Sequence, residues 1–150
     1  MPRLGLLNVA SKTKDRKPTR YLYGHFTSDT QSFGGGLTNA NVSVGSGLLV
    51  VIPTAGDGYA HRTLTVAAGT KYSIKVKTVV SSIGSGKLTL MVGTTAGATD
   101  LCSQLCPDNG TTYRSSFTTG GSTTTVHLGL KVENSGNMWY ADDLLVETWD

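Results

Sequence analysis

Apolar and polar residues alternate along much of the chain from about residue 38 onward, which is the period of a half-buried β-strand. Segment 72–79 is the clearest case, because Tyr72, Ile74 and Val76 fall on one face and polar residues on the other. Clusters of Gly, Ser, Asn and Asp separate such segments, as turns do in a sandwich. The expected strands are Gly47–Ile52, Arg62–Val66, Tyr72–Val79, Leu88–Val92, Tyr113–Thr118, Thr124–Glu133 and Met138–Glu147.

This pattern predicts an all-β fold, an antiparallel β-sandwich of seven to eight strands, with no convincing helix. Composition agrees: Gly, Ser and Thr fill more than a third of the 150 residues, and they are poor interior helix formers. A hydrophobic content of 38% suffices for a core, so the composition excludes a disordered chain. We find neither the long apolar run of a membrane-spanning helix nor the apolar stretch of a signal peptide.

Positive charge is concentrated at the start of the chain. Residues 1–20 hold six basic side chains and one acidic one, whereas the remainder holds seven basic and nine acidic side chains. We therefore predict two parts, a basic extended N-terminal arm over residues 1–33 and the sandwich over residues 34–150, with Gly34–Gly36 as a hinge. The basic residues expected to contact a partner are Arg3, Lys12, Lys14, Arg16, Lys17 and Arg20.

The arm favours an acidic protein surface as its partner, the alternative being a solvated tail with no partner. Nucleic acid is disfavoured, because the body is mildly acidic and no aromatic residues are interleaved with the cations. A membrane is disfavoured too, because Lys17-Pro18 interrupts any amphipathic helix.

The sequence contains no catalytic constellation, and we predict that the protein is not an enzyme. His25, His61 and His127 match no metal-binding spacing, and His127 is expected on the solvent face of its strand. A nucleophile elbow and a phosphate-binding loop are both missing, and only two Glu are available as glycosidase carboxylates. Binding is therefore favoured over catalysis.

Two cysteines, Cys102 and Cys106, lie close together in a segment expected to be a loop. Their spacing allows a small disulfide, but two free thiols in a protein assembled in a reducing cytosol are favoured.

Exposed aromatic rings are the usual platforms for sugars, so we searched for aromatic residues with polar neighbours. Trp139 and Tyr140 are adjacent in a strand, so only one of them can point inward. The candidate glycan contacts are Tyr59, Arg62, Tyr113, Arg114, Trp139 and Tyr140.

The segments Gly47–Val51, Val66–Ser73, Met91–Gly97 and Tyr140–Val146, in this order, resemble the jelly-roll of carbohydrate-binding modules and the galactose-binding-like superfamily. That jelly-roll recurs in virion proteins of tailed bacteriophages. The resemblance implies a trimeric capsid decoration (cement) protein that docks on the major capsid protein or other virion subunits and is assembled in the host cytoplasm. The alternative is a tail-fibre or tailspike-associated module that binds host-surface glycans.

The resemblance also bears on two local features. Gly69 is expected to take a positive φ in the turn before Tyr72, which anchors the edge of the core. Related modules hold a structural calcium near the position of Asp142 and Asp143, but the chain has few carboxylates to complete six to eight oxygen ligands. A hydrogen-bonding role at the edge of the sandwich is favoured for both residues, and no other cofactor is expected.

Overall fold

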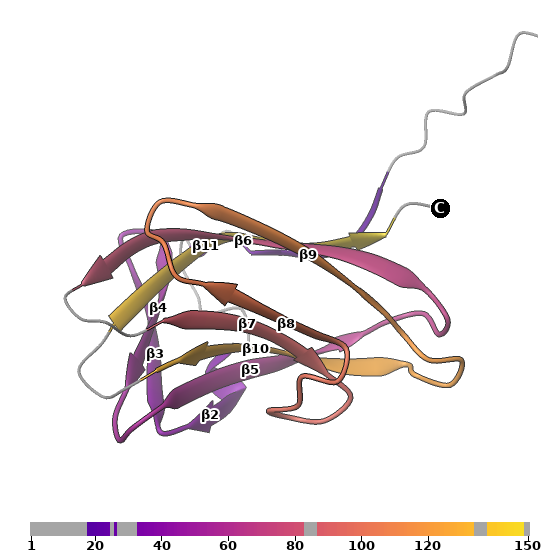
Figure 1. Ribbon diagram of the computed structural model, residues 1–150, viewed down its shortest axis with the longest axis horizontal. Helices are drawn as coiled ribbons and strands as arrows, with labels where there is room; N and C mark the ends of the chain where they lie inside the picture. The colour runs from indigo at the N-terminus through magenta and orange to yellow at the C-terminus, as the bar shows by residue number, and fades with distance from the viewer. Residues whose placement is uncertain (1–17, 25, 27–32, 83–86, 134–137, 149–150) are drawn as a thin grey trace, which may run out of the picture.

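Two stacked antiparallel β-sheets make up the computed structural model, which describes residues 18–24, 26, 33–82, 87–133 and 138–148 (Figure 1). The strands are β1 (Thr19–Gly24), β2 (Gly36–Thr38), β3 (Ala40–Gly45), β4 (Leu48–Pro53), β5 (Gly58–Thr65), β6 (Lys71–Ser82), β7 (Leu88–Gly93), β8 (Cys102–Cys106), β9 (Thr112–Thr118), β10 (Thr125–Val132) and β11 (Met138–Thr148). A single 3-10 turn, η1 (Phe33–Gly35), is the only helical element in the described part. No helix there is long and apolar enough to cross a membrane.

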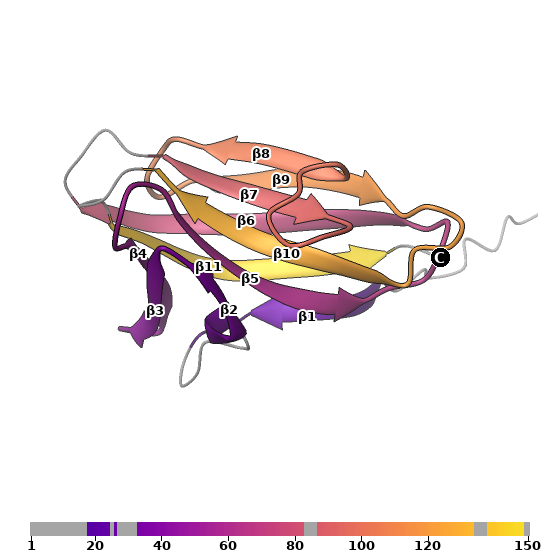
Figure 2. The same ribbon diagram turned by 90° about the horizontal axis from the view of Figure 1, so that it is seen from below.

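We call the two layers sheet A and sheet B. Sheet A has the order β3-β4-β11-β6-β9, with β1 also paired to β11, and sheet B has the order β2-β5-β10-β7-β8. Figure 2 views the sandwich from the sheet B side, with β10, β5 and β7 crossing the front. Every strand pair in the described ranges is antiparallel, so the predicted all-β antiparallel sandwich is confirmed. These ranges hold eleven strands, where seven to eight were expected.

The core lies between the sheets and follows the predicted alternation. In β6, Tyr72, Ile74 and Val76 are buried, and the Tyr72 ring stacks on Phe117 of β9 with centroids 5.0 Å apart. Burial of such side chains contributes about 1.5–3 kcal/mol each relative to exposure. The strand β10 supplies four further residues that are fully buried, Val126, Leu128, Leu130 and Val132. Gly69 takes φ 61° in the turn before β6, as expected.

Four strands, β1, β2, β3 and β8, were not expected from the sequence. The hairpin between β3 and β4 turns on Ser46 (φ 55°) and Gly47 (φ 78°), the two positive φ angles of a type I′ turn. Gly47 therefore belongs to the turn, whereas the strand predicted from the sequence, Gly47–Ile52, included it. A serine before the glycine gives a weaker turn signal than Asn-Gly, so the strand on its N-terminal side went unrecognised.

Part of the segment assigned to the arm is built into the sandwich. Residues 19–24 form β1, which pairs with the second half of β11, and Leu22 is buried in the core. Where a hinge was expected, residues 33–38 form η1 and β2, and Phe33 is fully buried against Phe26. Residues 1–17 lie outside the described residues.

The cysteine segment is strand β8 and not a loop. Cys102 and Cys106 both face the core, are buried and are free thiols. A separation of four residues in a strand corresponds to about 13 Å, whereas a disulfide requires Cα atoms within about 7 Å, so the small disulfide considered from spacing is wrong. Burial raises the pKa of the Cys106 thiol to about 12.

Both thiols are therefore expected to resist a thiol reagent in the native protein. At pH 8 the Cys106 thiol is protonated, and only the thiolate attacks. With Ellman's reagent in guanidinium chloride, both thiols should react rapidly, giving two equivalents of the coloured thiolate product per protein. Without guanidinium chloride the reaction should be slow. Rapid release from the native protein would contradict the burial of β8.

Candidate functional site

The six candidate glycan contacts do not form one platform. Trp139 is only 2% exposed and belongs to the core, so its ring has no surface to offer a sugar. Tyr113 packs against the core, and its hydroxyl donates to Oδ2 of Asp108 at 3.0 Å. Arg62 is level with the buried Leu128 of β10 and shares its inward face. Alternation then places Arg114 and Tyr140 on the outer face of sheet A, and Tyr59 on the outer face of sheet B.

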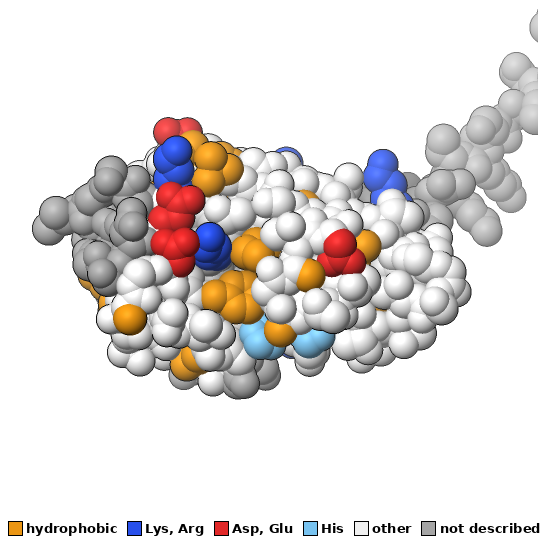
Figure 3. All heavy atoms as spheres, turned by 60° about the horizontal axis from the view of Figure 1, so that its bottom comes forward, with side chains coloured by type: hydrophobic (Ala, Val, Ile, Leu, Met, Phe, Trp, Pro, Cys, Tyr) orange, Lys and Arg blue, Asp and Glu red, His pale blue; other side chains and the backbone are white. Residues whose placement is uncertain are grey.

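Tyr59 is the candidate that lines a groove. The groove has a volume of roughly 340 Å³ and lies on the outer face of sheet B, with Tyr59, His61, Met91, Lys131, Thr38 and the Ala96-Gly97 loop around it. Figure 3 shows this face, where the histidines adjoin hydrophobic side chains. A groove of this volume lies in the range of small-ligand sites in proteins.

Two glycines position the aromatic rings of the groove. A Cβ atom on Gly129 of β10 would overlap the ring of Tyr59, and a Cβ atom on Gly36 of β2 would overlap the ring of His61. Each ring therefore rests directly on the backbone of a neighbouring strand. The two ring centroids are 5.3 Å apart and the ring planes are inclined by only 20°, so the rings are stacked nearly parallel to one another.

A hydrogen bond fixes the Tyr59 ring at its far end. The backbone N–H of Gly97, in the loop after β7, donates to the Tyr59 hydroxyl at 2.9 Å. Burial raises the pKa of Tyr59, and this hydrogen bond partly offsets the effect. The phenol is therefore neutral at physiological pH, and it ties β5 to the loop that borders the groove.

His127 of β10 adjoins His61, as its predicted position on the solvent side of its strand allows. The ring centroids are 5.3 Å apart. Desolvation by burial lowers the pKa of His61, and the neighbouring His127 lowers it further, while a hydrogen bond with the Gly36 backbone acts in the opposite direction. At pH 7 the His61 ring is consequently neutral, because its ordinary pKa of about 6.5 is already below that pH.

Among the described residues that line the groove, Lys131 is the one Lys or Arg, and its charge is paired. Nζ of Lys131 lies 2.9 Å from Oδ2 of Asp57, and both side chains are partly exposed. Such a pair contributes little to stability, but it cancels the charge at this end of the groove. The groove surface thus combines neutral rings, a thioether and an ion pair, which suits an uncharged polar ligand.

Of the basic residues proposed to contact a partner, Arg20 is described, and it lies in β1 level with Glu147 of β11. Arg3, Lys12, Lys14, Arg16 and Lys17 lie outside the described residues. Asp142 and Asp143 lie at a register shift in β11, where Asp143 has φ 47°. No group of three or more His, Cys, Asp or Glu in the described ranges is arranged to hold a metal ion.

The sequence did not indicate that His61 belongs to the groove, or that Gly129 and Gly36 make room for the rings of Tyr59 and His61. Tyr59 and His61 are two residues apart in one strand, so their shared face was available as a signal. The positions of Gly36 and Gly129 beneath these rings depend on the register of β2 and β10 against β5, which the sequence does not reveal.

No family model and no curated protein matches this chain. Among solved structures, it is similar to the CBM22-1 xylan-binding domain from Paenibacillus barcinonensis Xyn10C, with a TM-score of 0.56 and 17% identity over 89% of this chain and 96% of that one. It is also similar to TmCBM61 in complex with β-1,4-galactotriose, with a TM-score of 0.54 and 14% identity over 85% and 97% of the two chains.

A third similar structure is the enzymatically active domain of bacteriophage CBA120 tailspike protein 4. The TM-score is 0.52 and the identity 14%, and the match covers 83% of this chain but 22% of the tailspike chain. At these identities the likeness concerns the fold. The chain has the β-sandwich jelly-roll fold found in carbohydrate-binding modules and in one part of a phage tailspike.

Proposed function

We propose that this protein is a carbohydrate-binding module that holds an uncharged glycan in the groove of sheet B. The observation that carries the proposal is the Tyr59 ring, which lies on Gly129, is tethered at its hydroxyl by Gly97 and lines the groove. Sugar rings present C–H faces that pack on aromatic rings, and a ring already fixed loses little entropy on binding.

The polar groups around the rings suit hydroxyl groups of a sugar. Thr38, the neutral His61 and Lys131 border the groove and offer donors and acceptors, while Met91 adds an adaptable apolar contact. Because the Lys131 charge is balanced by Asp57, an uncharged glycan gains more than an anionic one here.

The fold likeness to two carbohydrate-binding modules supports this proposal, and the likeness to a tailspike domain supports a role in recognising host-surface glycans. Capsid decoration stays a prediction, because the basic residues on which it depends lie mostly outside the described residues. None of the three structures compared above is a capsid protein. The trimer and the virion location likewise stay predictions.

Titration calorimetry of the full chain against xylan, β-1,4-galactan, mixed-linkage β-glucan and their oligosaccharides tests the proposal. We expect at least one to bind with a Kd in the micromolar range (about −8 kcal/mol), and its trisaccharide to bind more tightly than its monosaccharide. If none of these glycans, nor any on a wider array of neutral host-surface glycans, binds, the proposal is wrong.

A further inference from the structure

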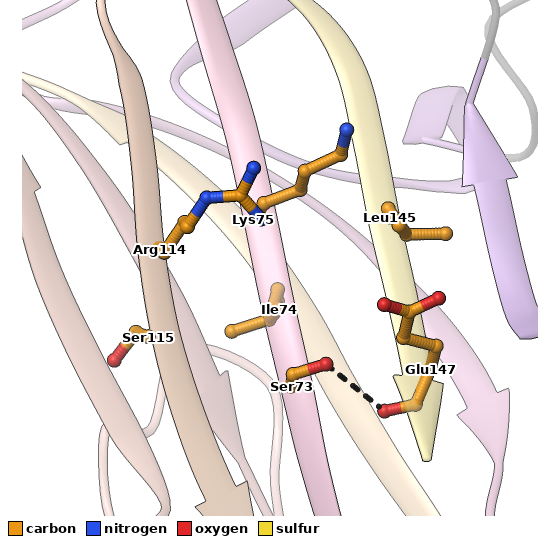
Figure 4. Close-up of a pocket in the computed structure, with 7 residues that line it drawn as sticks. All are labelled: Ser73, Ile74, Lys75, Arg114, Ser115, Leu145 and Glu147. Atoms are coloured by element: carbon orange, nitrogen blue, oxygen red, sulfur yellow. Dashed lines mark hydrogen bonds between the residues drawn. The ribbon is translucent and has the colours of Figure 1, made fainter. Parts of the chain in front are cut away.

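A second surface, on the opposite side of the sandwich, carries unpaired positive charge. The outward residues of β6 include Lys71, Lys75 and Lys77, which alternate with the buried Tyr72, Ile74 and Val76. Arg114 of β9 is directly level with Lys75. Figure 4 shows the guanidinium of Arg114 extending from β9 over β6 to the side of the Lys75 side chain.

Like charges placed directly opposite one another on neighbouring strands are destabilising. Neither Lys75 nor Arg114 makes an ion pair with any residue in the described part of the chain. A bound anion would remove this repulsion, and a guanidinium donates two parallel hydrogen bonds to a carboxylate or a sulfate.

The cation pair borders a hollow of the right size for such a group. The hollow has a volume of roughly 70 Å³, and Ser73, Leu145 and Glu147 complete its wall. A water molecule occupies about 30 Å³ in the liquid, so the hollow accommodates one small oxyanion. The Ser73 hydroxyl donates to the backbone oxygen of Glu147 at 3.4 Å, a long hydrogen bond that a ligand can replace.

The surface continues along the strands beyond this hollow. A second hollow of roughly 160 Å³ lies beside Lys71, Tyr72, Ser73 and Ser116 on the same two strands. From Lys71 to Lys77 the strand advances about 20 Å, with cations on one face. Several cations in a line suit a chain with repeated charges better than a single free ion.

We propose that the outer face of sheet A is a second binding site, and that it takes an acidic polysaccharide whose carboxylate or sulfate group binds between Lys75 and Arg114. This site goes beyond the proposed function, because it lies on the other sheet and takes a different class of glycan. Glu147 shares the hollow and Asp142 is level with Lys77, so the face is mixed in charge. That mixture disfavours the dense phosphates of nucleic acid and favours a polymer with spaced charges and hydroxyl groups.

Affinity electrophoresis of the full chain tests the site, with polygalacturonate, dextran sulfate or unmodified dextran in the gel. We expect retardation by one or both acidic polymers and none by dextran, and the two acidic gels separate carboxylate from sulfate recognition. Arg114→Gln should weaken binding about tenfold, as loss of a charge-assisted hydrogen-bond pair does. The control Lys87→Gln removes the same charge from an exposed residue outside the site, and it should change binding less than twofold.

Any of three results would overturn the proposal. The first is no retardation by either acidic polymer, and the second is an equal loss of binding in Arg114→Gln and Lys87→Gln. The third is binding to duplex DNA or to an acidic protein that is tighter than binding to the acidic polysaccharides.

Tyr59→Ala should leave binding to the acidic polymers unchanged. This variant therefore distinguishes failure of the sheet B proposal from failure of this one. Circular dichroism spectra of the variants verify that each remains folded.

Discussion

Replacing Trp139 with alanine is expected to lower the free energy of unfolding by about 3–5 kcal/mol, the usual cost of removing a buried Trp or Phe side chain. Trp139 is 2% exposed and belongs to β11, which pairs with β1, β4 and β6. The cavity would thus open where the central strand of sheet A meets the core. Urea denaturation followed by far-UV circular dichroism measures the change.

The neighbouring Tyr140 supplies the matched control. It is half-buried on the outer face of sheet A, and its hydroxyl makes only a weak contact with Sδ of Met138 at 3.5 Å. Tyr140→Ala should cost about 1 kcal/mol. Equal losses for the two variants would show that the assignment of faces in β11 is wrong. If Trp139→Ala does not fold, Trp139→Phe should still be less stable than the wild type.

Gly129→Ala is expected to weaken glycan binding at least tenfold (about 1.4 kcal/mol) while leaving the fold intact. The added methyl group would overlap the Tyr59 ring, so the ring must move away from Gly129 and the hydrogen bond from the Gly97 N–H must break. The backbone of Gly129 has no positive φ, and alanine in a strand loses less entropy on folding than glycine. Calorimetry with the glycan that binds the wild type measures the loss.

Gly121→Ala is the control for this experiment, because nothing lies within 4 Å of its added Cβ atom and its φ is not positive. It should bind as the wild type does. Tyr59→Phe adds a second comparison, since it keeps the ring but loses the hydroxyl that Gly97 contacts, and its loss should be smaller than that of Tyr59→Ala. Unchanged binding by both Gly129→Ala and Tyr59→Ala would exclude the groove as the site.

The long strands could be predicted from the sequence because their two faces differ in polarity. In β10, and in the first half of β6 up to Val76, every second residue is apolar, and these residues are buried. β8 lacked such a signal, because Cys102 and Cys106 are its buried apolar residues and its centre is polar. β1 is held by pairing with β11, more than a hundred residues away along the chain, and local pattern does not reveal such pairing.

The candidate site could be predicted only in part, because local sequence pattern does not reveal how the strands pair. Tyr59 was recognised as an aromatic candidate, and the adjacency of Trp139 and Tyr140 limited one of them to the core. Which one points inward depends on the register of β11 against its partners. The groove itself arises from residues of β2, β5, β7 and β10, which only the sheet order brings together.

A titration of the ¹⁵N-labelled protein with the tightest-binding neutral oligosaccharide, followed by amide chemical shifts, tests the central claim most directly. The amides of Gly36, His61, Gly97 and Gly129 should shift with a common Kd, because these residues form or seat the groove. The amides of Lys75 and Ser116 on the outer face of sheet A should not move. Shifts confined to sheet A, or to the ends of the sandwich, would contradict a glycan site on sheet B.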